Sequence, residues 1–419
     1  MTRDMHMFRR WRALTFTLLY LAFAVAFFHR VAPTVIASDM AESLGASAFA
    51  IGSIGAMYYY AYSLMQIPSG ILADRIGPRL SVGGSMILGG LGSIVFALSP
   101  DVFTANLGRL IIGLGVAFAF VGTMRAAASW FDPRAYAMAT SWIILAGNAG
   151  AVLAGSPLAW LLNYVSWRSV FFGIGLFSVA LALAVLWLVR DTPARAGFAS
   201  SPGIGPTGTG GAIWPRLKDA LRQRNIWLSL LAGGGIMGGY FGFTGVWAVP
   251  YMEVRSGLSQ QQAADILTVS LFALAAGVPV CGWLADRVIG RKPLIVICAA
   301  ACAVIWLVLA AWPSPGYWMM LLLLCAYGIA GGAMVAIFAI TKEQSPPAAV
   351  GFSIAVVNTG LFGAAAVLQL VLGWVLSLTT SPAYPQGNFV AAVALLLGGS
   401  TIGLIAGLML KENPQHAVE

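Results

Sequence analysis

The sequence predicts an all-α membrane protein with twelve transmembrane helices in two pseudo-symmetric six-helix bundles. Three observations support this prediction. Of the 419 residues, 59% are hydrophobic and only 9% are charged, which is too little charge to cover the surface of a soluble protein. Apolar stretches of about 20 residues, long enough to cross the hydrocarbon core of a bilayer, recur along the chain. A short charged sequence also occurs twice, at equivalent places in the two halves.

The expected transmembrane segments are joined by short connections, apart from one long connection in the middle of the chain. That connection, 191–225, is rich in Gly, Pro, Ser and Thr near its centre, as flexible linkers are. It separates an N-terminal six-helix bundle, 1–190, from a C-terminal one, 226–419. In chain order the segments are Ala13–Ala37, Ala48–Leu72, Leu80–Leu98, Leu107–Phe131, Tyr136–Leu162, Trp167–Val189, Ile226–Tyr251, Ala263–Ala285, Pro293–Ala311, Trp318–Ile340, Val350–Leu378 and Asn388–Leu410.

The linker contains a glycine run between Gly203 and Gly211. No strand is expected before it and no Gly-Lys-Ser/Thr follows it, so it does not predict a phosphate-binding loop. Its end, from Trp214 to Arg224, alternates apolar and basic residues, which favours a short helix on the inner membrane surface.

Basic residues lie mostly on one side of the expected membrane. With the N-terminus inside, only Arg168 and Arg255 fall outside. The positive-inside rule therefore places both termini in the cytoplasm and requires an even number of spans. This topology accounts for the net charge of +9 without a nucleic-acid partner. We expect a multi-pass protein of the cytoplasmic (inner) membrane. The inner residues are Arg3, Arg9, Arg10, Arg12, Arg75, Arg79, Arg134, Arg190, Arg195, Arg216, Lys218, Arg222, Arg224, Arg287, Arg291, Lys292, Lys342 and Lys411.

The four cysteines fall inside apolar segments, so free buried thiols are expected. Cys298 and Cys302 share a helix face, but no nearby His or third Cys supports a metal site. We expect neither a metal nor a cofactor. The first apolar run is too long for the hydrophobic region of a signal peptide, and no cleavage-site pattern follows it.

The duplicated sequence follows the second and the eighth expected segment. The first copy is Gly70-Ile-Leu-Ala-Asp-Arg-Ile-Gly-Pro-Arg79, and the second is Gly282-Trp-Leu-Ala-Asp-Arg-Val-Ile-Gly-Arg-Lys292. Each copy lies in an inner loop between helices two and three of a six-helix set. Many secondary transporters are built from such internal repeats.

With this duplicated loop as its signature, the whole chain resembles the major facilitator superfamily. The resemblance implies that the aspartate and arginines of the loop latch the inner ends of helices when the carrier faces outward. These gating roles fall to Asp74, Arg75 and Arg79, with Gly77 forming the tight turn. The second copy, with one extra residue before its glycine, gives Asp286, Arg287 and Arg291 the same role. The alternative is that these are solvated loop charges that only set topology.

Two further stretches bear on the branch of the family. Helix four begins Gly108-Arg109-Leu-Ile-Ile-Gly113-Leu-Gly115, similar to the family's Arg-x-x-x-Gly-x-Gly pattern, which gives Arg109 and Gly113 structural roles. Helix five departs from the drug-antiporter signature. The segments from Phe28 to Pro33 and from Tyr59 to Pro68 resemble a bacterial branch with largely unassigned substrates.

Basic side chains occur within the expected spans, whereas carboxylates are absent from the span centres, and this pattern predicts the chemical class of the substrate. Arg30, Arg109 and Arg125 fall within spans, as does His29, whereas no acidic residue lies near the centre of a span. Arginine presents a planar bidentate donor to carboxylates and phosphates. The family resemblance implies that helices one, four, seven and ten line the cavity, so Arg30 and Arg125 are candidate substrate contacts. Arg125 snorkelling to the inner surface is the alternative.

His29 is a candidate proton carrier because its pKa range suits that role, although a structural histidine would look the same. Polar and aromatic groups of other helices complete the expected substrate site. For each of them, helix packing is the alternative explanation. They are Tyr59, Tyr62, Asn148, Tyr240, Trp247 and Asn358, with Thr244 as a further candidate.

The sequence therefore predicts a secondary active transporter, such as a symporter, that moves a small organic anion or zwitterion by alternating access. A carboxylate, a phosphate ester and a short peptide all fit, with a proton or ion as a candidate coupled partner. The alternative is an efflux antiporter for multiple drugs or lipophilic compounds, and a more remote one is a membrane sensor that does not transport. An enzyme or an ATP-driven pump is not expected, since no catalytic set or Walker motif occurs. The resemblance implies a monomer.

Overall fold

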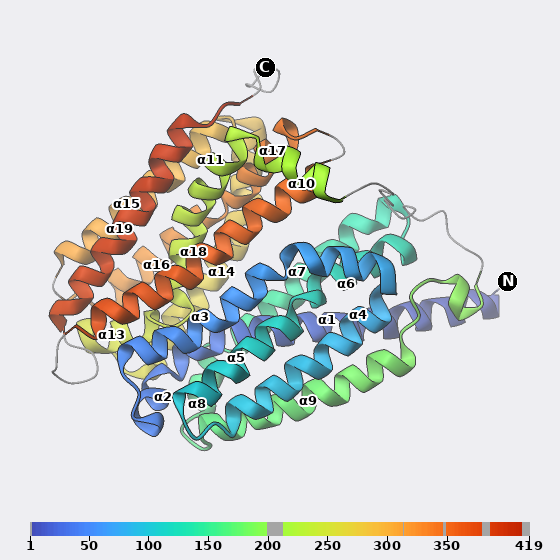
Figure 1. The fold of residues 1–419 in the computed structure, drawn as a ribbon, viewed down its shortest axis with the longest axis horizontal. Helices are drawn as coiled ribbons and strands as arrows, with labels where there is room; N and C mark the ends of the chain where they lie inside the picture. Colours follow the sequence, from blue (N-terminus) through green and yellow to red (C-terminus); the bar gives the residue numbers. More distant parts are fainter. Residues whose placement is uncertain (1, 199–212, 313, 347–348, 379–385, 413–419) are drawn as a thin grey trace. The chain divides into compact units, whose positions relative to one another are not determined.

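The computed structural model describes residues 2–198, 213–312, 314–346, 349–378 and 386–412. Within these ranges the chain is helical and contains no strand (Figure 1). This confirms the predicted all-helical fold. The glycine run of the expected linker lies outside the described residues.

The chain divides by its internal contacts into two compact units. The first unit comprises Met1–Arg30, Leu64–Ala154 and Tyr164–Gly210, and the second comprises Val31–Ser63, Gly155–Asn163 and Gly211–Glu419. The second unit thus contains helices from both halves of the sequence. The expected bundles 1–190 and 226–419 stay a prediction.

The helices of the first unit begin with α1, whose last turn belongs to the second unit. They are α1 (Thr2–Val35), α4 (Gln66–Ala97), α5 (Val102–Val116), α6 (Phe118–Trp130), α7 (Pro133–Leu153) and α9 (Trp167–Leu188), with a short 3₁₀ turn η1 (Ala194–Ala196).

The second unit contains three helices from the first half of the sequence and all helices of the second half. They are α2 (Ala37–Leu44), α3 (Ala48–Leu64), α8 (Ser156–Leu161), α10 (Ile213–Leu221), α11 (Arg224–Gly233), the π-helix η2 (Gly234–Gly238), α12 (Gly239–Thr244), α13 (Ala248–Ser256), α14 (Gln260–Arg287), α15 (Arg291–Ala311), α16 (Tyr317–Gly331), α17 (Met334–Gln344), α18 (Val350–Leu376) and α19 (Gln386–Met409).

Eleven helical stretches of the described chain are long and apolar enough to cross a membrane. The expected segment Ala48–Leu72 is not among them, because the helix is interrupted at Met65. Its residues belong to α3 and to the start of α4. The membrane-spanning character is therefore confirmed, whereas the number twelve stays a prediction.

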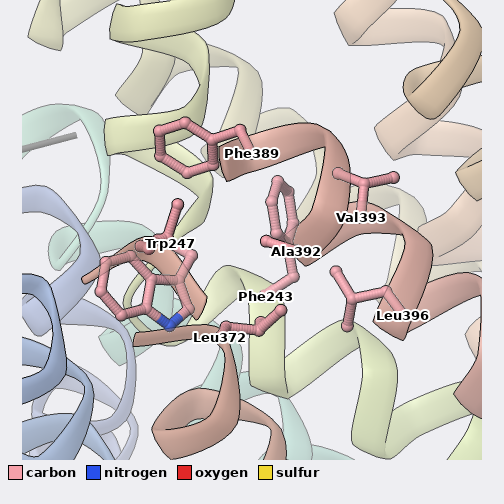
Figure 2. A pocket seen from close by; sticks show the side chains of 8 residues that line it. Phe243, Trp247, Leu372, Phe389, Ala392, Val393 and Leu396 are labelled. Atoms are coloured by element: carbon pink, nitrogen blue, oxygen red, sulfur yellow. The ribbon is translucent and has the colours of Figure 1, made fainter. Parts of the chain in front are cut away.

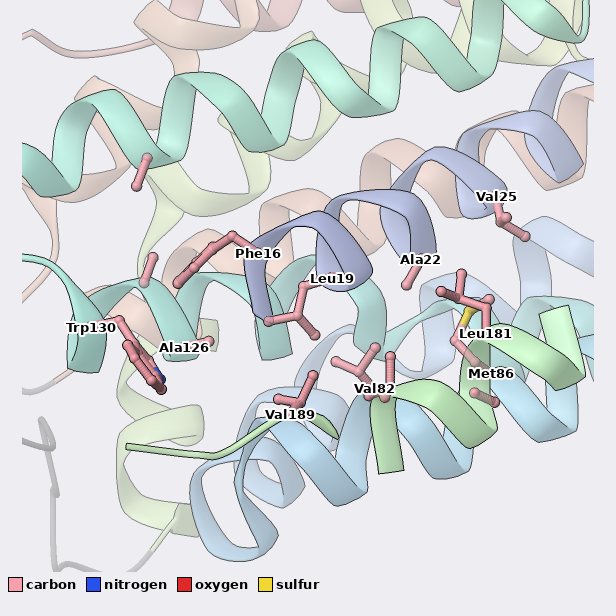
Figure 3. Packing of buried hydrophobic residues seen from close by; sticks show 14 residues of the cluster. Phe16, Leu19, Ala22, Val25, Val82, Met86, Ala126, Trp130, Leu181 and Val189 are labelled. Atoms are coloured by element: carbon pink, nitrogen blue, oxygen red, sulfur yellow. The ribbon is translucent and has the colours of Figure 1, made fainter. Parts of the chain in front are cut away.

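The core of the first unit is built from α1, α4, α6 and α9 (Figure 3). Phe16 and Leu19 of α1 pack with Val82 and Met86 of α4, and alanines occupy many of the remaining positions. Small residues let helices approach closely, which replaces the hydrophobic driving force that is absent between helices in lipid.

The surface of the described helices carries large apolar side chains. Trp187, Phe103 and Trp318 are each more than three-quarters exposed. A soluble protein rarely exposes contiguous apolar surface, so these side chains are expected to contact lipid. The tryptophans near helix ends match the aromatic belts of membrane proteins.

Helices α4 and α5 meet at glycines. A Cβ atom at Gly115 would lie 2.2 Å from the backbone nitrogen of Gly89, whereas one at Gly84, also on α4, would meet nothing within 4 Å. The crossing therefore depends on the absence of a side chain at Gly115.

We expect Gly115→Ala to lower the melting temperature of the purified protein, because the α4 and α5 backbones must move apart, at a cost of about 1–3 kcal/mol. Gly84→Ala is the matched control and should leave stability unchanged or slightly higher, since Ala favours helix over Gly. Thermal unfolding followed by tryptophan fluorescence measures both. Equal effects of the two substitutions would contradict the close-crossing argument.

Candidate functional site

The two copies of the duplicated loop adopt the same backbone turn. Gly77 has φ 81° and ψ 166°, and Gly290 has φ 83° and ψ 165°. A positive φ of this kind strongly favours glycine. The structure therefore aligns these two glycines, despite the extra residue that precedes Gly290.

A distant carboxylate caps the helix start after each of these glycines. Asp191 accepts a hydrogen bond from the backbone nitrogen of Arg79 at 2.8 Å. Glu412 accepts from the backbone nitrogens of Arg291 and Lys292 at 3.0 and 3.3 Å. Negative charge at a helix N-terminus is favourable, because the first N–H groups lack partners within the helix.

Sequence reasoning missed Asp191 and Glu412. A signal was present, since each carboxylate directly follows a basic residue just after the last helix of its half, as Arg190-Asp191 and Lys411-Glu412. A Cβ atom at Gly77 would lie 2.7 Å from Oδ1 of Asp191, so the glycine also makes room for its cap.

The charged residues of the loops form different ion pairs in the two copies. Asp74 lies 3.5 Å from Nε of Arg125 on α6. In the second copy Asp286 pairs with Arg291 at 3.1 Å, and Arg291 also pairs with Glu343 of α17. The charge supplied by the neighbouring helix is thus reversed between the copies.

The remaining gating candidates make weaker or no ionic contacts. Arg79 donates from Nε to the carbonyl of Leu186, which ties the turn to α9. Arg75 and Arg287 are exposed. Neither takes part in an ion pair within the described part of the chain.

Arg30 and Arg109 are buried in the first unit, with exposed fractions of 4% and 1%. The Arg30 guanidinium lies over the ring of Phe27 at 4.3 Å. Arg109 donates to the carbonyl oxygen of His29 at 2.9 Å, which links α5 to α1. The structural role expected for Arg109 stays a prediction. Gly113 is also buried in α5.

His29 is fully buried against Phe171, with ring centroids 5.7 Å apart. Neither imidazole nitrogen has a hydrogen-bond partner within the described chain. A buried polar group without a partner costs roughly 1–3 kcal/mol of stability. If position 29 served only helix packing, an apolar residue would avoid the cost that His29 brings.

Arg125 and Asn148 are the other substrate-site candidates in the first unit. Arg125 is half-buried and is engaged by Asp74, sixteen residues or about 24 Å along the helical path from Arg109. Asn148 lies half-buried on α7. The structure therefore places Arg125 beside Asp74 of the duplicated loop.

Tyr59 and Tyr62 of α3 meet an aromatic cluster in the second unit. The ring of Tyr62 lies 4.9 Å from Phe362 of α18, and the ring of Tyr59 lies 6.1 Å from Phe362 and 6.4 Å from Phe241. Asn358 lies half-buried one turn before Phe362 on α18. Both tyrosines are buried, so in this conformation they pack one half of the sequence against the other.

Trp247 lies beside the same α3–α18 contact, nearer the start of α3. Its indole nitrogen donates to the carbonyl of Gln369 at 3.1 Å. The helices α3 and α18 cross there at Gly52 and Gly373, where an added Cβ would lie 2.6 or 2.7 Å from a backbone oxygen. The contact is too tight for larger residues.

Tyr240 belongs to a separate cluster beside the π-helix Gly234–Gly238. Its hydroxyl lies 3.0 Å from that of Ser270. Tyr327 donates to the carbonyl of Ile236 at 3.0 Å, and Ser400 donates to that of Gly235 at 3.1 Å. Side chains thus bind carbonyls of the π-helix. Short π-helical segments often occur at functional sites.

Polar contacts join the ends of α1, α2 and α8 to α13 and α14 within the second unit. Ser38 donates to Glu253 at 2.8 Å, and Gln260 donates to Asp39 at 3.0 Å. Ser156 at the start of α8 donates to Asp265 of α14. We call these contacts the outer contact set, after the side of the membrane on which the sequence predicts them to lie. They connect segments from opposite halves of the sequence.

Two carboxyls of the outer contact set have raised pKa values. Burial raises the pKa of Glu253, and the charge of Asp39 adds to this effect, while the hydrogen bond from Ser38 opposes it. Burial also raises the pKa of Asp39, with a smaller contribution from Glu42 and an opposing hydrogen bond from Gln260. Protonation of these two carboxyls therefore stabilises the folded state relative to the unfolded state, although the hydrogen bonds from Ser38 and Gln260 favour the charged form.

A small cavity lies beside Trp247 in the second unit (Figure 2). Its volume is about 10 Å³, roughly enough for one water molecule, and its lining is apolar, with Phe243, Leu372 and Phe389 among the side chains. Nothing in this lining could bind the charge of an organic acid. Within the described chain no group of three His, Cys, Asp or Glu residues could hold a metal ion.

Comparison with known proteins places this geometry in context. The chain matches the model of the Major Facilitator Superfamily over residues 18–264 and 244–419. It is 23% identical to the probable galactarate/D-glucarate transporter GudP of Bacillus subtilis (strain 168), over 95% of this chain and 91% of that protein. It is 26% identical to a putative tartrate transporter of Agrobacterium vitis, over 97% and 92%.

Other relatives bear different names or align over less of their length. The transcription regulatory protein OpdE of Pseudomonas aeruginosa is 29% identical over 87% of this chain and 85% of that protein. Two further relatives are matched over 63% and 62% of their own length.

Solved structures with the same fold include a mutant form of the nucleoside transporter NupG. Its TM-score is 0.78 at 15% identity, over 95% of this chain and 100% of that one. A bacterial homolog of the human lysosomal transporter Spinster, in an inward-facing and unoccupied conformation, gives a TM-score of 0.72 at 17% identity, over 96% and 99%.

We expect the double variant Asp39→Asn, Glu253→Gln to be more stable than the parent at pH 8 and little different at pH 4. The folded state holds these protons more tightly than the unfolded state. The parent therefore loses stability as pH rises from the ordinary values of 3.8 and 4.5 through the raised ones. The variant is neutral throughout. Melting temperatures across this pH range test the prediction.

Asp101→Asn is the control with the opposite sign. The exposed Asp101 carboxylate accepts from the backbone nitrogen of Thr104, which lowers its pKa. This variant should lose stability at pH 8 and not below the lowered pKa. A lower melting temperature of the Asp39/Glu253 variant at pH 8 would contradict the argument.

Proposed function

The chain belongs to the Major Facilitator Superfamily, and from this premise we propose that it is a secondary transporter for a small organic anion that carries a carboxylate. The observation behind the substrate class is the buried guanidinium of Arg30, fixed over Phe27 at 4.3 Å. Burying a cation in a span is costly, so such residues commonly mark a substrate path.

Both the chemistry of arginine and the names of the relatives support a carboxylate. A guanidinium binds carboxylate with two parallel hydrogen bonds, which gives strength and orientation. Two relatives that align over more than nine-tenths of their length are named for galactarate, D-glucarate or tartrate. These are sugar-derived diacids, so a polyhydroxy acid is the substrate that we propose.

The proposed mechanism is alternating access between two halves, 1–190 and 226–419, joined by the linker 191–225. The outer contact set, together with the α3–α18 crossing, would form the closed outer gate. The π-helix in the middle of the seventh expected helix would provide a place for bending, since an irregular ladder of hydrogen bonds marks a common hinge. The inner turns at Gly77 and Gly290 would form the inner gate.

We propose a cytoplasmic-membrane location with both termini in the cytoplasm. The distribution of basic residues supports this orientation. Arg255, one of two basic residues on the proposed outer side, is buried and donates to the carbonyl of Trp312. Arg168, the other, donates to the carbonyls of Ala97 and Ser99, so both have structural partners.

A sensor is the second candidate function, because one relative of 29% identity is named a transcription regulatory protein. Efflux of lipophilic cations is a third. The sensor would bind a ligand without moving it across the membrane. Uptake of radiolabelled ligand into proteoliposomes separates these functions: accumulation of a diacid supports transport, binding without accumulation supports a sensor, and movement of lipophilic cations alone supports efflux.

We expect galactarate, D-glucarate or tartrate to raise the melting temperature of the purified protein, by an amount equivalent to about 2.7 kcal/mol at 100 times the dissociation constant. Arg30→Gln should weaken binding roughly 10- to 100-fold, because hydrogen bonds to charged groups contribute about 1.5–3 kcal/mol. Arg168→Gln is the matched control and should bind normally. Full binding by the Arg30 variant would remove the basis for the proposal.

Asp74→Asn should reduce the transport rate and leave the melting temperature nearly unchanged. The Asp74–Arg125 pair is largely exposed on the Asp74 side, and exposed pairs contribute only about 0–1 kcal/mol to stability. If the pair serves gating, the exchanged variant Asp74→Arg, Arg125→Asp should recover part of the rate. A normal rate in Asp74→Asn would show that the charges only set topology.

A further inference from the structure

A groove between α1 and α7 in the first unit contains about 790 Å³ of space open to its surroundings. Arg9, Arg12 and Tyr20 of α1 line one side, and Met138 and Trp142 of α7 line the other. Phe131 closes one end. None of these residues belongs to the proposed substrate path or to the gates.

Among the described residues, neither basic side chain of the groove has an acidic ion-pair partner, and the Arg12 guanidinium rests on aromatic rings. The Arg12 guanidinium lies 4.9 Å from the ring centre of Phe131 and 5.3 Å from that of Phe8. Within the described chain neither Arg9 nor Arg12 forms an ion pair. Asp132, next to Phe131 in the sequence, is not part of the lining. The groove therefore presents uncompensated positive charge.

Along the α1 side of the groove, the charged residues come first and the aromatic residues follow. Arg9, Arg12, Phe16 and Tyr20 recur at intervals of three or four residues, so they follow one face of α1. From Arg9 to Tyr20 the helix rises about 16 Å. The arginines stand at the start of the span, and the aromatic side chains lie deeper. Tyr20 donates to the carbonyl of Ala139 at 3.3 Å and so joins α1 to α7 beside the groove.

The α7 wall continues as an exposed apolar stripe. Met138 is 63% exposed and Trp142 is 53% exposed, and Leu145 and Leu153 extend the stripe along the same helix face. A different face of α7 packs on α1, where Gly147 meets Phe23 and Phe27. An exposed Met-Trp-Leu-Leu stripe in a span is a surface for acyl chains.

From this combination we propose that the α1–α7 groove is a binding site for an anionic phospholipid. Arg9 and Arg12 bind the phosphate and the charged headgroup, and the stripe from Met138 to Leu153 receives an acyl chain. Basic pockets between transmembrane helices on the cytoplasmic side bind such headgroups. In the proposed orientation the lipid comes from the cytoplasmic leaflet, but binding itself does not depend on the transport function.

The test uses the full chain, purified in detergent and stripped of lipid. Dioleoylphosphatidylglycerol is compared with dioleoylphosphatidylcholine, which has the same acyl chains and no net charge, and with glycerol phosphate, which has no chains. Bound lipid is counted by native mass spectrometry, and binding is titrated by thermal shift. We expect at least fivefold tighter binding of phosphatidylglycerol than of phosphatidylcholine, and no effect of glycerol phosphate.

Variants distinguish the contribution of the arginine charges to lipid binding from the contribution of open space in the groove. Arg9→Gln with Arg12→Gln should abolish the preference for phosphatidylglycerol, whereas Arg10→Gln with Arg222→Gln removes the same charge outside the groove and should retain it. Ala13→Phe fills the groove and leaves both arginines, so it should weaken binding of phosphatidylglycerol. The melting temperature without lipid shows that each variant is folded.

Three results would overturn the proposal. The first is equal binding of the two lipids, the second is equal loss of binding in both arginine variants, and the third is full stabilisation by glycerol phosphate alone. The last would identify a site for a free anion instead. Diacid uptake by the same variants is measured separately, so failure of the lipid site and failure of the transport proposal remain distinguishable.

Discussion

A backbone N–H or C=O group that lies in lipid or is buried in the protein must find a partner there, because water does not reach it. The irregular points of this chain follow from that constraint. Where the helix turns sharply at Gly77 and Gly290, a carboxylate supplies the missing acceptor. At the π-helix, Tyr327 and Ser400 bind the carbonyls of Ile236 and Gly235. Irregular structure is thus paired with specific polar side chains.

The two halves obey the constraint with the same geometry and different charges. The turn glycines have nearly identical backbone angles, and a carboxylate from beyond the last helix caps each turn. The neighbouring helix, however, contributes Arg125 in one half and Glu343 in the other. Backbone geometry tolerates little variation, whereas a salt bridge works with either polarity. The backbone turn has therefore kept its form between the halves, while the side-chain pairing has diverged.

Most of the fold could be predicted from the sequence, because the length of an apolar segment and the Gly-Asp-Arg repeat are local properties. The interruption at Met65 was missed, although Pro68 marks it, because a proline has no N–H for the carbonyl of Leu64 and its ring crowds that carbonyl. Asp191 and Glu412 were missed because their partners lie more than a hundred residues away. Arg125 shows the same limit: its position within a span was evident, but its pairing with Asp74 depends on how α4 and α6 pack. For Tyr59 and Tyr62 the sequence could give burial but not their contact with Phe362.

The carboxylate caps also bear on how the protein is made. Asp191 lies 112 residues beyond Arg79, and Glu412 lies 121 residues beyond Arg291. A chain that emerges from the ribosome from its N-terminus forms the turn at Gly77 long before its cap exists. The start of the third expected helix therefore lacks its carboxylate cap until the segment after the sixth expected helix has been synthesised. In the same way, the start of the ninth lacks its cap until the segment after the twelfth has been synthesised. Each cap can therefore form only after the segment that follows the last helix of its half has been synthesised.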